Sequence, residues 1–537
     1  MSIRRRFVTF SILFALGTGC GPRGPSSTAV AHAMDARLDT LDRGSVAVRD
    51  QSLLEPTAMS RFYRVRGNRP AWDRRKAEQI VEAIRGVKAD GLDPADYHLA
   101  AIERFLKAEP AEAKPAADLD LLLTDAVAAI VDHARYGRVH PYALNPAWNM
   151  DPREGAPPLE QTVARIASAG SPRDAIEAQK PHHFIYRGLV RALAQLEAID
   201  AKGGWPAVPS GRALRPGMSD PRIAAVRARL HASGEYPGSS ESNLYDAELK
   251  RAVALFQARH RLDEDGILGK GTIDAMNVTA GQRASQIRVN LERARWVLGG
   301  LGSNFLLVNL PAFKAYLIRG GRNVWEARTQ IGDEAKQTPS FTAKMRTVVF
   351  NPDWTVPNSI VAEEVLEPMQ RGVNALAEKK LHVFNAKDEE VDPSSVDWDT
   401  ADPDHFNYTL RQPPGKDNPL GRVKFLFPNK YAIYLHDTPS QHLFDTEKRT
   451  FSHGCIRIEN ALQLAEILLR DQGWGRSRIE QALATTETQD VNLAHPFPVV
   501  IVYWTVSVGA SGEVRFAKDI YDLDRPLYAA LNAPPRR

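Results

Sequence analysis

The period of the hydrophobic pattern changes near residue 304, and this change constrains the fold more than any other feature of the chain. Before it, apolar residues recur at helical spacing, as in Ala77, Ile80, Val81, Ile84 and Val87 and again in Leu119, Leu122, Leu123, Val127 and Ile130. After it, short β-branched and aromatic runs indicate strands at 305–310, 313–318, 347–350, 423–427, 431–435 and 499–505. At about 150 residues per domain, a chain of 537 residues is long enough for three or four domains. We therefore predict a multidomain α+β protein with a helical N-terminal part.

The N-terminus has the layout of an export signal. Arg4 to Arg6 precede ten mostly apolar residues, Phe7 to Leu16, whereas a membrane-spanning helix needs roughly 20. Leu16-Gly17-Thr18-Gly19-Cys20 resembles a bacterial lipoprotein box, although its leucine is one place too far upstream, and Ala31-His32-Ala33 fits ordinary signal cleavage. We favour lipidation of Cys20, which would associate the protein with the membrane, over simple cleavage. Arg4-Arg5 adds a twin-arginine route as a weaker alternative, and every route predicts an exported protein of the periplasm.

The two cysteines, Cys20 and Cys455, are too few for a disulfide framework or an all-cysteine metal cage. The formal charge is +4, and Arg4 to Arg6 supply three of these charges, which leaves a near-neutral body without a basic run. This balance excludes nucleic acid as a partner on electrostatic grounds. If Cys20 is acylated or removed, Cys455 is the only thiol in an oxidising compartment, so its presence there needs a chemical reason.

Composition and punctuation divide the chain into five parts. Residues 21–50 are rich in Gly, Pro, Ser and Ala without periodicity, and we expect a tether or loosely ordered lead-in there. The stretch from 357 to 422 is long enough to be a lid-like insertion over a site. The predicted parts are a signal and tether start (1–33), a helical scaffold (34–205), a small helical module (206–283), a mainly β domain (284–523) and a C-terminal tail (524–537).

The small helical module carries a recognisable pattern. Its residues Ala252-Val253, Phe256-Gln257, Asp265-Gly266-Ile267 and Gly269-x-x-Thr272 lie on and between two helical segments. This run resembles the three-helix peptidoglycan-binding domain found beside many wall enzymes. The resemblance implies anchoring on wall glycan.

The chemistry of the chain concentrates around Cys455. His436 ends a predicted strand and precedes Cys455 by 19 positions, and His453 lies two residues before it. A thiol attacks carbonyl groups as its thiolate, so it needs a neighbouring base. Gly454 allows close approach of a substrate and can leave amide groups free for an oxyanion hole. We expect a helix from about Asn460 to hold the nucleophile on a rigid element.

Two other interpretations fit the same residues. A lone buried cysteine is usually a small inert apolar residue, and a lone histidine is usually an ordinary hydrogen-bonded one. Alternatively, His436, His442, His453 and Cys455 offer nitrogen and sulfur ligands for zinc, and spacing alone does not exclude such a site.

A family resemblance favours catalysis. His436, fifteen residues and then Ser452-His453-Gly454-Cys455-Ile456-Arg457 match the signature of the YkuD-type L,D-transpeptidase domain, a β-rich fold with a cysteine nucleophile. The match extends to Asn351-Pro352-x-Trp354-Thr355-Val356-Pro357, to Gln412-Pro413-x-Gly415-x-x-Asn418-x-Leu420-Gly421 and to Phe427-Pro428-Asn429. With the helical region, the binding module and the insertion, the layout of residues 55–523 resembles the large YcbB-type L,D-transpeptidases.

The resemblance implies a role for each residue of the signature. Cys455 would be the nucleophile and His436 the general acid and base, oriented by the backbone carbonyl of Asp437. His453 is expected to support the site by hydrogen bonding, and amides near Gly454 and Cys455 to hold the oxyanion. For Arg457 we favour bracing of the loop through a salt bridge over contact with a stem carboxylate. The remaining supporting residue is Ser452, and the expected pocket wall is Trp354 and Tyr434.

The resemblance further implies a peptidoglycan L,D-transpeptidase. Such an enzyme forms 3-3 cross-links between stem peptides through a cysteine thioester, releases D-Ala, needs no cofactor or metal and is inhibited by carbapenem-type β-lactams. An L,D-carboxypeptidase or cysteine peptidase acting on wall peptides is one alternative, although NlpC-type peptidases place Cys before His. The other is a non-catalytic, zinc-containing wall-binding protein. The acceptor and the oligomeric state stay open.

Overall fold

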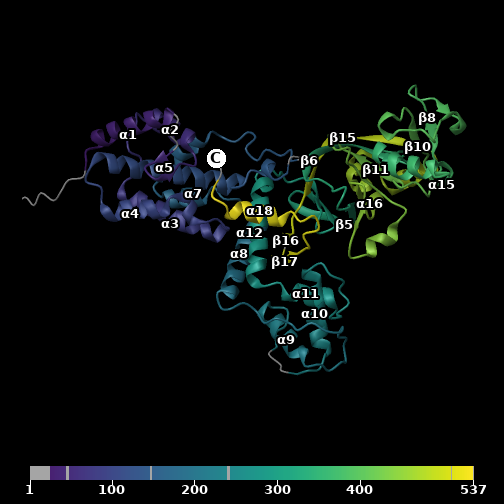
Figure 1. Ribbon diagram of the computed structural model, residues 1–537, viewed down its shortest axis with the longest axis horizontal. Coiled ribbons are helices and arrows are strands. Elements are labelled where there is room, and N and C mark those ends of the chain that lie inside the picture. Colours follow the sequence, from purple (N-terminus) through teal and green to yellow (C-terminus); the bar gives the residue numbers. More distant parts are fainter. Residues whose placement is uncertain (1–24, 44–46, 146–147, 239–241, 510, 536–537) are drawn as a thin grey trace, which may run out of the picture.

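The computed structural model describes residues 25–43, 47–145, 148–238, 242–509 and 511–535. Figure 1 shows an elongated molecule with a helical region at one end, a sheet-rich domain at the other and a small helical module that projects from the middle. This arrangement confirms the predicted multidomain α+β class. The proposed signal segment, with Cys20, lies outside the described residues. Across the described ranges, no helix combines the length and apolar character that a membrane span requires.

The N-terminal region is a bundle around one long, nearly fully buried helix, α5 (Ala113–Tyr136). The stripe of Ala77, Ile80, Val81 and Ile84 is buried against this bundle, as the spacing predicts. Around α5 lie a two-stranded ribbon, β1 (Ala47–Val48) and β2 (Gln51–Ser52), and the helices α1 (Ser27–Asp42), α2 (Pro56–Val65), α3 (Arg74–Gly86), α4 (Leu99–Ala108), α6 (Leu159–Ser168), α7 (Pro172–Glu177) and α8 (Phe184–Asp200).

Helix α1 corrects the expectation of a loose tether over residues 21–50. The Ser26 hydroxyl accepts a hydrogen bond from the amide of Ala29 and caps the helix. Val30, Met34 and Leu38, spaced four residues apart, are buried in the scaffold core. The segment is rich in Gly, Pro, Ser and Ala, so its short apolar stripe was not recognised from the composition. Burial of this stripe against α5 stabilises a helix whose intrinsic helix propensity is modest.

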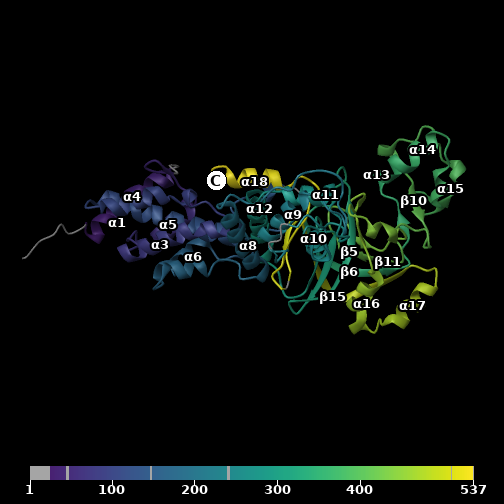
Figure 2. The same ribbon diagram turned by 90° about the horizontal axis from the view of Figure 1, so that it is seen from below.

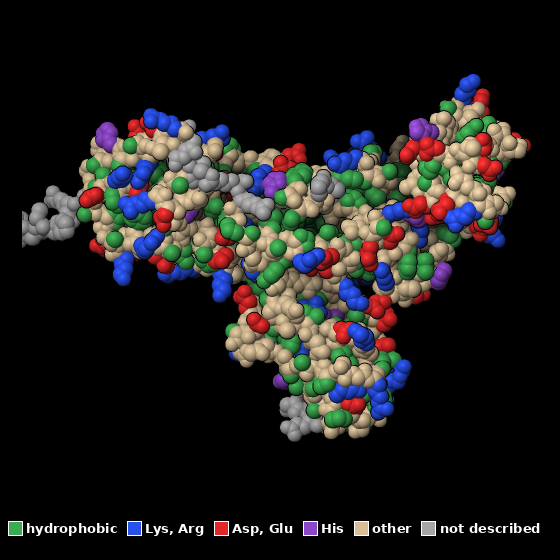
Figure 3. Space-filling view, viewed as in Figure 1, with side chains coloured by type: hydrophobic (Ala, Val, Ile, Leu, Met, Phe, Trp, Pro, Cys, Tyr) green, Lys and Arg blue, Asp and Glu red, His purple; other side chains and the backbone are tan. Residues whose placement is uncertain are grey.

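The small module has three helices, α9 (Arg222–Ala232), α10 (Ala247–Arg259) and α11 (Lys270–Asn277). Asp246 caps α10 by accepting from the amide of Leu249, and Gly266 adopts φ +65° in the turn that follows. Figure 3 shows Lys and Arg interspersed with Asp and Glu over the visible face of this module and of the scaffold.

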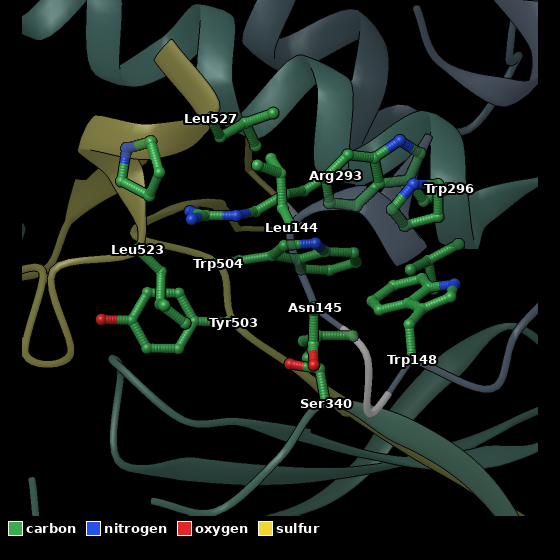
Figure 4. Close-up of a pocket in the computed structure, with 14 residues that line it drawn as sticks. Leu144, Asn145, Trp148, Arg293, Trp296, Ser340, Tyr503, Trp504, Leu523 and Leu527 are labelled. Atoms are coloured by element: carbon green, nitrogen blue, oxygen red, sulfur yellow. The ribbon is translucent and has the colours of Figure 1, made fainter. Parts of the chain in front are cut away.

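Helix α12 (Ala280–Leu298) joins the parts of the molecule. It packs against α8 and against the C-terminal helix α18 (Asp524–Asn532), so the predicted tail contains a packed helix. A hairpin of β16 (Val506–Val508) and β17 (Val514–Phe516) also contacts α8. Figure 4 shows where this joint meets the sheet: Trp148, Trp296 and Trp504 surround a cavity of about 60 Å³ that none of the candidate site residues line.

The sheet-rich domain is built on nine strands in the order β13-β5-β14-β12-β11-β6-β15-β3-β4, and β4 also pairs with β5, which closes a ring of eight. One apolar cluster fills it, and helices α16 (Ala461–Leu469) and α17 (Arg476–Ala484) pack beside it. The strands are β3 (Phe305–Asn309), β4 (Lys314–Arg319), β5 (Arg322–Gly332), β6 (Phe341–Phe350), β11 (Val423–Leu426), β12 (Leu435–His436), β13 (Thr450–Ser452), β14 (Ile456–Ile458) and β15 (Gln489–Val502).

The insertion between β6 and β11 has a sheet and an apolar cluster of its own. The sheet has the order β7-β10-β8-β9, and a π-helical turn at Ala362–Leu366 follows the first short helix. In Figure 2 the insertion lies on one side of the main sheet and helices α16 and α17 lie on the other. Its elements are β7 (Trp354–Thr355), α13 (Asn358–Val361), α14 (Glu367–Gln370), α15 (Ala375–Lys379), β8 (His382–Phe384), β9 (Glu390–Val391) and β10 (Thr409–Gln412).

Candidate active site

Two adjacent strands bring His436 and Cys455 to the same part of the sheet. Strand β12 pairs in parallel with β14, with Leu435 opposite Ile456 and His436 opposite Arg457. Cys455 immediately precedes β14, and the amide of Ile456 donates to the carbonyl of Tyr434 at 3.1 Å. Histidine and cysteine, 19 positions apart in the chain, therefore lie on neighbouring strands of one sheet.

The alternation of side chains places the candidate residues on one face of this sheet. Leu435, Ile456 and Ile458 are fully buried in the apolar cluster. Because successive residues of a strand point to opposite faces, His436 and Arg457 point away from that cluster. The same alternation directs Tyr434 and Cys455 to this face, and the rings of Tyr434 and His436 lie 5.6 Å apart.

A tight turn before β14 sets the position of the thiol. Gly454 adopts φ +113°, and a Cβ there would lie 3.2 Å from Cδ1 of Ile433, so the turn requires glycine. Ser452 Oγ donates to the carbonyl of Cys455 at 2.5 Å and accepts from the amide of Gly454 at 3.1 Å. The Gly454 amide, which sequence reasoning assigned to an oxyanion hole, is therefore engaged by Ser452.

His436 is held as a neutral imidazole. Its side chain is 3% exposed, and Nδ1 donates to the carbonyl of Asp437 at 2.6 Å. Burial lowers the pKa of His436 to about 3, and the positive charge of Arg457 acts in the same direction. The backbone of Pro419 is a second hydrogen-bond partner of the ring. With the proton on Nδ1, Nε2 of the neutral ring carries the lone pair that can take up a proton.

Cys455 is a protonated thiol in this environment. Burial raises the pKa of Cys455 above its ordinary value, while hydrogen bonds from Tyr434 and the charge of Arg457 act in the opposite direction. Its Sγ lies 3.8 Å from the carbonyl oxygen of Ala432. Sequence reasoning treated Tyr434 only as pocket wall, because no spacing rule predicts that its side chain hydrogen-bonds to the thiol.

Asp437 braces the strand that carries His436. Its Oδ2 accepts from the amide of Arg422 at 3.0 Å and its Oδ1 from the side chain of Gln441 at 3.2 Å. Gly421 has φ +63°, and a Cβ there would lie 2.5 Å from the Asp437 carboxylate. The glycine is needed for this close approach.

The insertion reaches the turn before Cys455 through its π-helical turn. Nε2 of His453 lies 3.3 Å from Oε1 of Glu364, whose other oxygen pairs with Lys379 at 2.7 Å. Glu363, one residue earlier, pairs with Lys336 of the loop after β5. These contacts bring the insertion against the turn that carries the thiol, and no motif in the sequence indicated the two glutamates.

Trp354 and Arg457 line a hollow of about 350 Å³ between the insertion and the sheet, together with His453. Trp354 is 7% exposed, which fits a pocket wall. Arg457 donates to Oε1 of Gln330 at 3.2 Å. Within the described ranges no carboxylate pairs with Arg457, so the salt bridge that we favoured for it from the sequence is not formed.

The four residues of the zinc alternative are not gathered into a ligand set. His442 is exposed on the short helical turn 441–445, whereas His436 is buried. In the part of the chain that the structure describes, no group of three or more His, Cys, Asp or Glu side chains could hold a metal ion.

Three family models match separate parts of the chain. They are described as a scaffold domain (residues 57–193), a "Putative peptidoglycan binding domain" (219–276) and an L,D-transpeptidase catalytic domain, YkuD (303–501). The last contains His436, Cys455 and the insertion. The YcbB subtype stays an expectation.

A protein of Haemophilus influenzae named "Putative L,D-transpeptidase" is 36% identical over 227 residues, which are 42% of this chain and 46% of the relative. The chain thus spans less than half the length of that relative. Two solved L,D-transpeptidases show only weak similarity to this chain. The structure from Xylanimonas cellulosilytica is 13% identical, covers 55% of this chain and 99% of its own, and has a TM-score of 0.17. The structure from Stackebrandtia nassauensis is 12% identical, covers 55% of this chain and 96% of its own, and has a TM-score of 0.21. Residues 303–501 therefore match the L,D-transpeptidase catalytic domain, YkuD, and residues 219–276 of the same chain match a peptidoglycan-binding domain.

Proposed function

We propose that this protein is a peptidoglycan L,D-transpeptidase that forms 3-3 cross-links between stem peptides. The observation that carries the proposal is the placement of Cys455 and a neutral His436 on one face of adjacent strands, within a YkuD domain. The peptidoglycan-binding module in the same chain supports wall glycan as the partner.

In the first half-reaction, Sγ of Cys455 attacks the carbonyl of the third residue of a donor stem, a diamino acid joined to terminal D-Ala. Nε2 of His436 takes the thiol proton and gives it to the amine of D-Ala as the peptide bond breaks. The products are a thioester on Cys455 and free D-Ala. The carbonyl of Asp437 keeps the His436 ring in the tautomer that this transfer needs.

In the second half-reaction, the side-chain amine of an acceptor stem attacks the thioester. His436 takes a proton from the amine and returns it to the sulfur as the carbon–sulfur bond breaks, which restores the thiol. The acceptor then carries a new amide bond between two third-position residues. Another stem is the acceptor that the layout of the chain favours.

The tetrahedral intermediates carry an oxyanion that needs donors. Because the Gly454 amide already donates to Ser452 Oγ, we assign this role to the amide of Cys455 itself. The Tyr434 hydroxyl, which hydrogen-bonds to the thiol, is a second donor beside it. We propose that these two groups hold the oxyanion and that His453 and Glu364 fix the insertion over the site as a lid-like cover. The same thiol would be acylated by carbapenem-type β-lactams.

Product analysis tests the function. The purified chain, incubated with a disaccharide tetrapeptide carrying a third-position diamino acid, should release D-Ala and yield a dimer with a 3-3 linkage, identified by tandem mass spectrometry. In this assay a second molecule of the tetrapeptide serves as the acceptor. A tetrapeptide whose side-chain amine is blocked cannot accept the acyl group and should therefore give no dimer. A tripeptide as the sole product, with or without acceptor, would instead indicate the L,D-carboxypeptidase alternative.

We propose export to the periplasm with lipidation at Cys20. Ala31-His32-Ala33 lies inside helix α1, where Val30 and Met34 are buried in the scaffold core. Cleavage after Ala33 would remove Val30 and the Ser26 cap, so processing upstream is favoured. Mass spectrometry of the membrane-extracted protein should find a diacylated or triacylated N-terminal cysteine. A soluble protein that begins at Met34 would contradict this.

A further inference from the structure

Arg457 is the middle residue of β14, which lies between β12 and β5. It lies opposite His436 on β12 and opposite Gln330 on β5. Its neighbours Ile456 and Ile458 are buried in the apolar cluster, so the Arg457 side chain points to the face that carries Cys455. The guanidinium group therefore stands beside the reacting thiol and not in the core.

The guanidinium group is poorly satisfied. Among the described residues it donates to Oε1 of Gln330 at 3.2 Å, and its Nε is buried without a hydrogen-bond partner. Burial lowers the pKa of Arg457, because the cation is taken out of water without a carboxylate in contact. An arginine presents five N–H donors in a planar fork that matches a carboxylate. Because Nε is buried, the Nη donors that Gln330 does not occupy are the part of the fork that can reach a ligand in the hollow that Arg457 lines.

The other cations of the adjoining hollow are already neutralised. Lys379 pairs with Glu364 at 2.7 Å and Lys380 with Asp417 at 2.6 Å. All four of these side chains line the 350 Å³ hollow together with Arg457. In the described part of the chain, Arg457 is thus the cation of this hollow that lacks a carboxylate partner.

We infer that Arg457 binds a carboxylate of the acyl-donor stem in this hollow and thereby selects the donor. The inference rests on the proposed function. Two carboxylates of a donor tetrapeptide have the required chemistry: that of the terminal D-Ala, and that on the side chain of a third residue such as a diamino diacid. Bidentate recognition of either by the Nη donors would hold the scissile carbonyl at a fixed distance from Cys455, which lies two residues before Arg457 and immediately before β14.

Three donors separate the two sources. One tetrapeptide carries both carboxylates, a second has its C-terminus amidated, and a third has the third-residue side-chain carboxyl amidated. On the free donor, Arg457→Gln should lower kcat/KM for release of the terminal residue about 100-fold, the usual range for loss of a charge-assisted contact. On the donor that lacks the recognised carboxylate, kcat/KM of the wild type should be lower by a similar factor. The Arg457→Gln substitution should then cause no further decrease in kcat/KM on that donor. The kcat/KM of Arg457→Lys, which keeps the positive charge but not the planar set of donors, should lie between those of the wild type and Arg457→Gln.

A binding measurement tests the same contact without catalysis. In a Cys455→Ala background, Arg457→Gln should raise the Kd of the free donor about 100-fold by calorimetry and leave the Kd of the amidated donor unchanged. Arg346→Gln, at an exposed arginine on β6 of the same sheet, is the matched control and should change neither quantity.

An equal loss on all three donors, with unchanged Kd values, would overturn the inference and leave Arg457 a bracing residue. If the wild type releases no terminal residue from any donor, the proposed function is wrong, and the Kd values alone then decide whether Arg457 binds a carboxylate.

Discussion

Replacing Cys455 with alanine is expected to abolish release of D-Ala and formation of 3-3 dimers, with a loss of at least about 10⁴-fold in kcat. Cys455 is the free cysteine of the described residues, and alanine has no sulfur on which a thioester could form. Release of D-Ala is measured with a coupled D-amino-acid assay, and dimers by mass spectrometry.

The control for this variant is wall binding. Cys455 lies in the catalytic domain, whereas the three-helix module has its own apolar core, so sedimentation with purified peptidoglycan should be unchanged. A carbapenem should add its mass to the wild-type chain at Cys455 and leave the alanine variant unmodified. Cross-linking by the variant within 100-fold of the wild type would refute the thioester mechanism.

His436→Asn is expected to lower kcat about 10³-fold, the upper part of the range for loss of a general acid and base. Asparagine can still donate to the carbonyl of Asp437, as Nδ1 does now at 2.6 Å, so the local fold is retained. It has no counterpart of Nε2, and the thiol proton loses its acceptor. The effect is measured as the single-turnover rate of thioester formation, with a thermal melt to show that the variant is folded.

The pH profile gives an independent view of His436. Only the neutral ring can take the thiol proton, and burial lowers the pKa of His436 to about 3. A lowered pKa keeps the active, neutral form populated as the pH falls, so kcat/KM of the wild type should not decline on the acid side near pH 6.5. Its acid limb should lie below about pH 5. A decline centred near pH 6.5 in a chain that stays folded would mean that His436 is solvated and is not the buried base described above.

The scaffold and the binding module were largely predictable from the sequence, because their information is local. Apolar spacing located helices α3 and α5, and Gly137 ends α5 as expected. Helix α1 was missed because a short apolar stripe in a segment rich in Gly, Pro and Ser forms a helix only when it packs against α5. The contact of Arg37 on α1 with Asp118 on α5 spans 81 positions of the chain. Strand β5 was missed because its first half is exposed and polar.

At the active site, the sequence by itself determined which residues are the candidates: a turn that requires glycine, a thiol after it and a histidine at the end of a strand are local features with a specific spacing. Only the tertiary structure decided their chemical states and their neighbours. The parallel pairing of β12 with β14 placed Arg457 against His436, and the insertion brought Glu364 to His453. The physical reason is that a pKa and a charge balance depend on desolvation and on groups from distant segments, and these exist only once the strands and the insertion have packed.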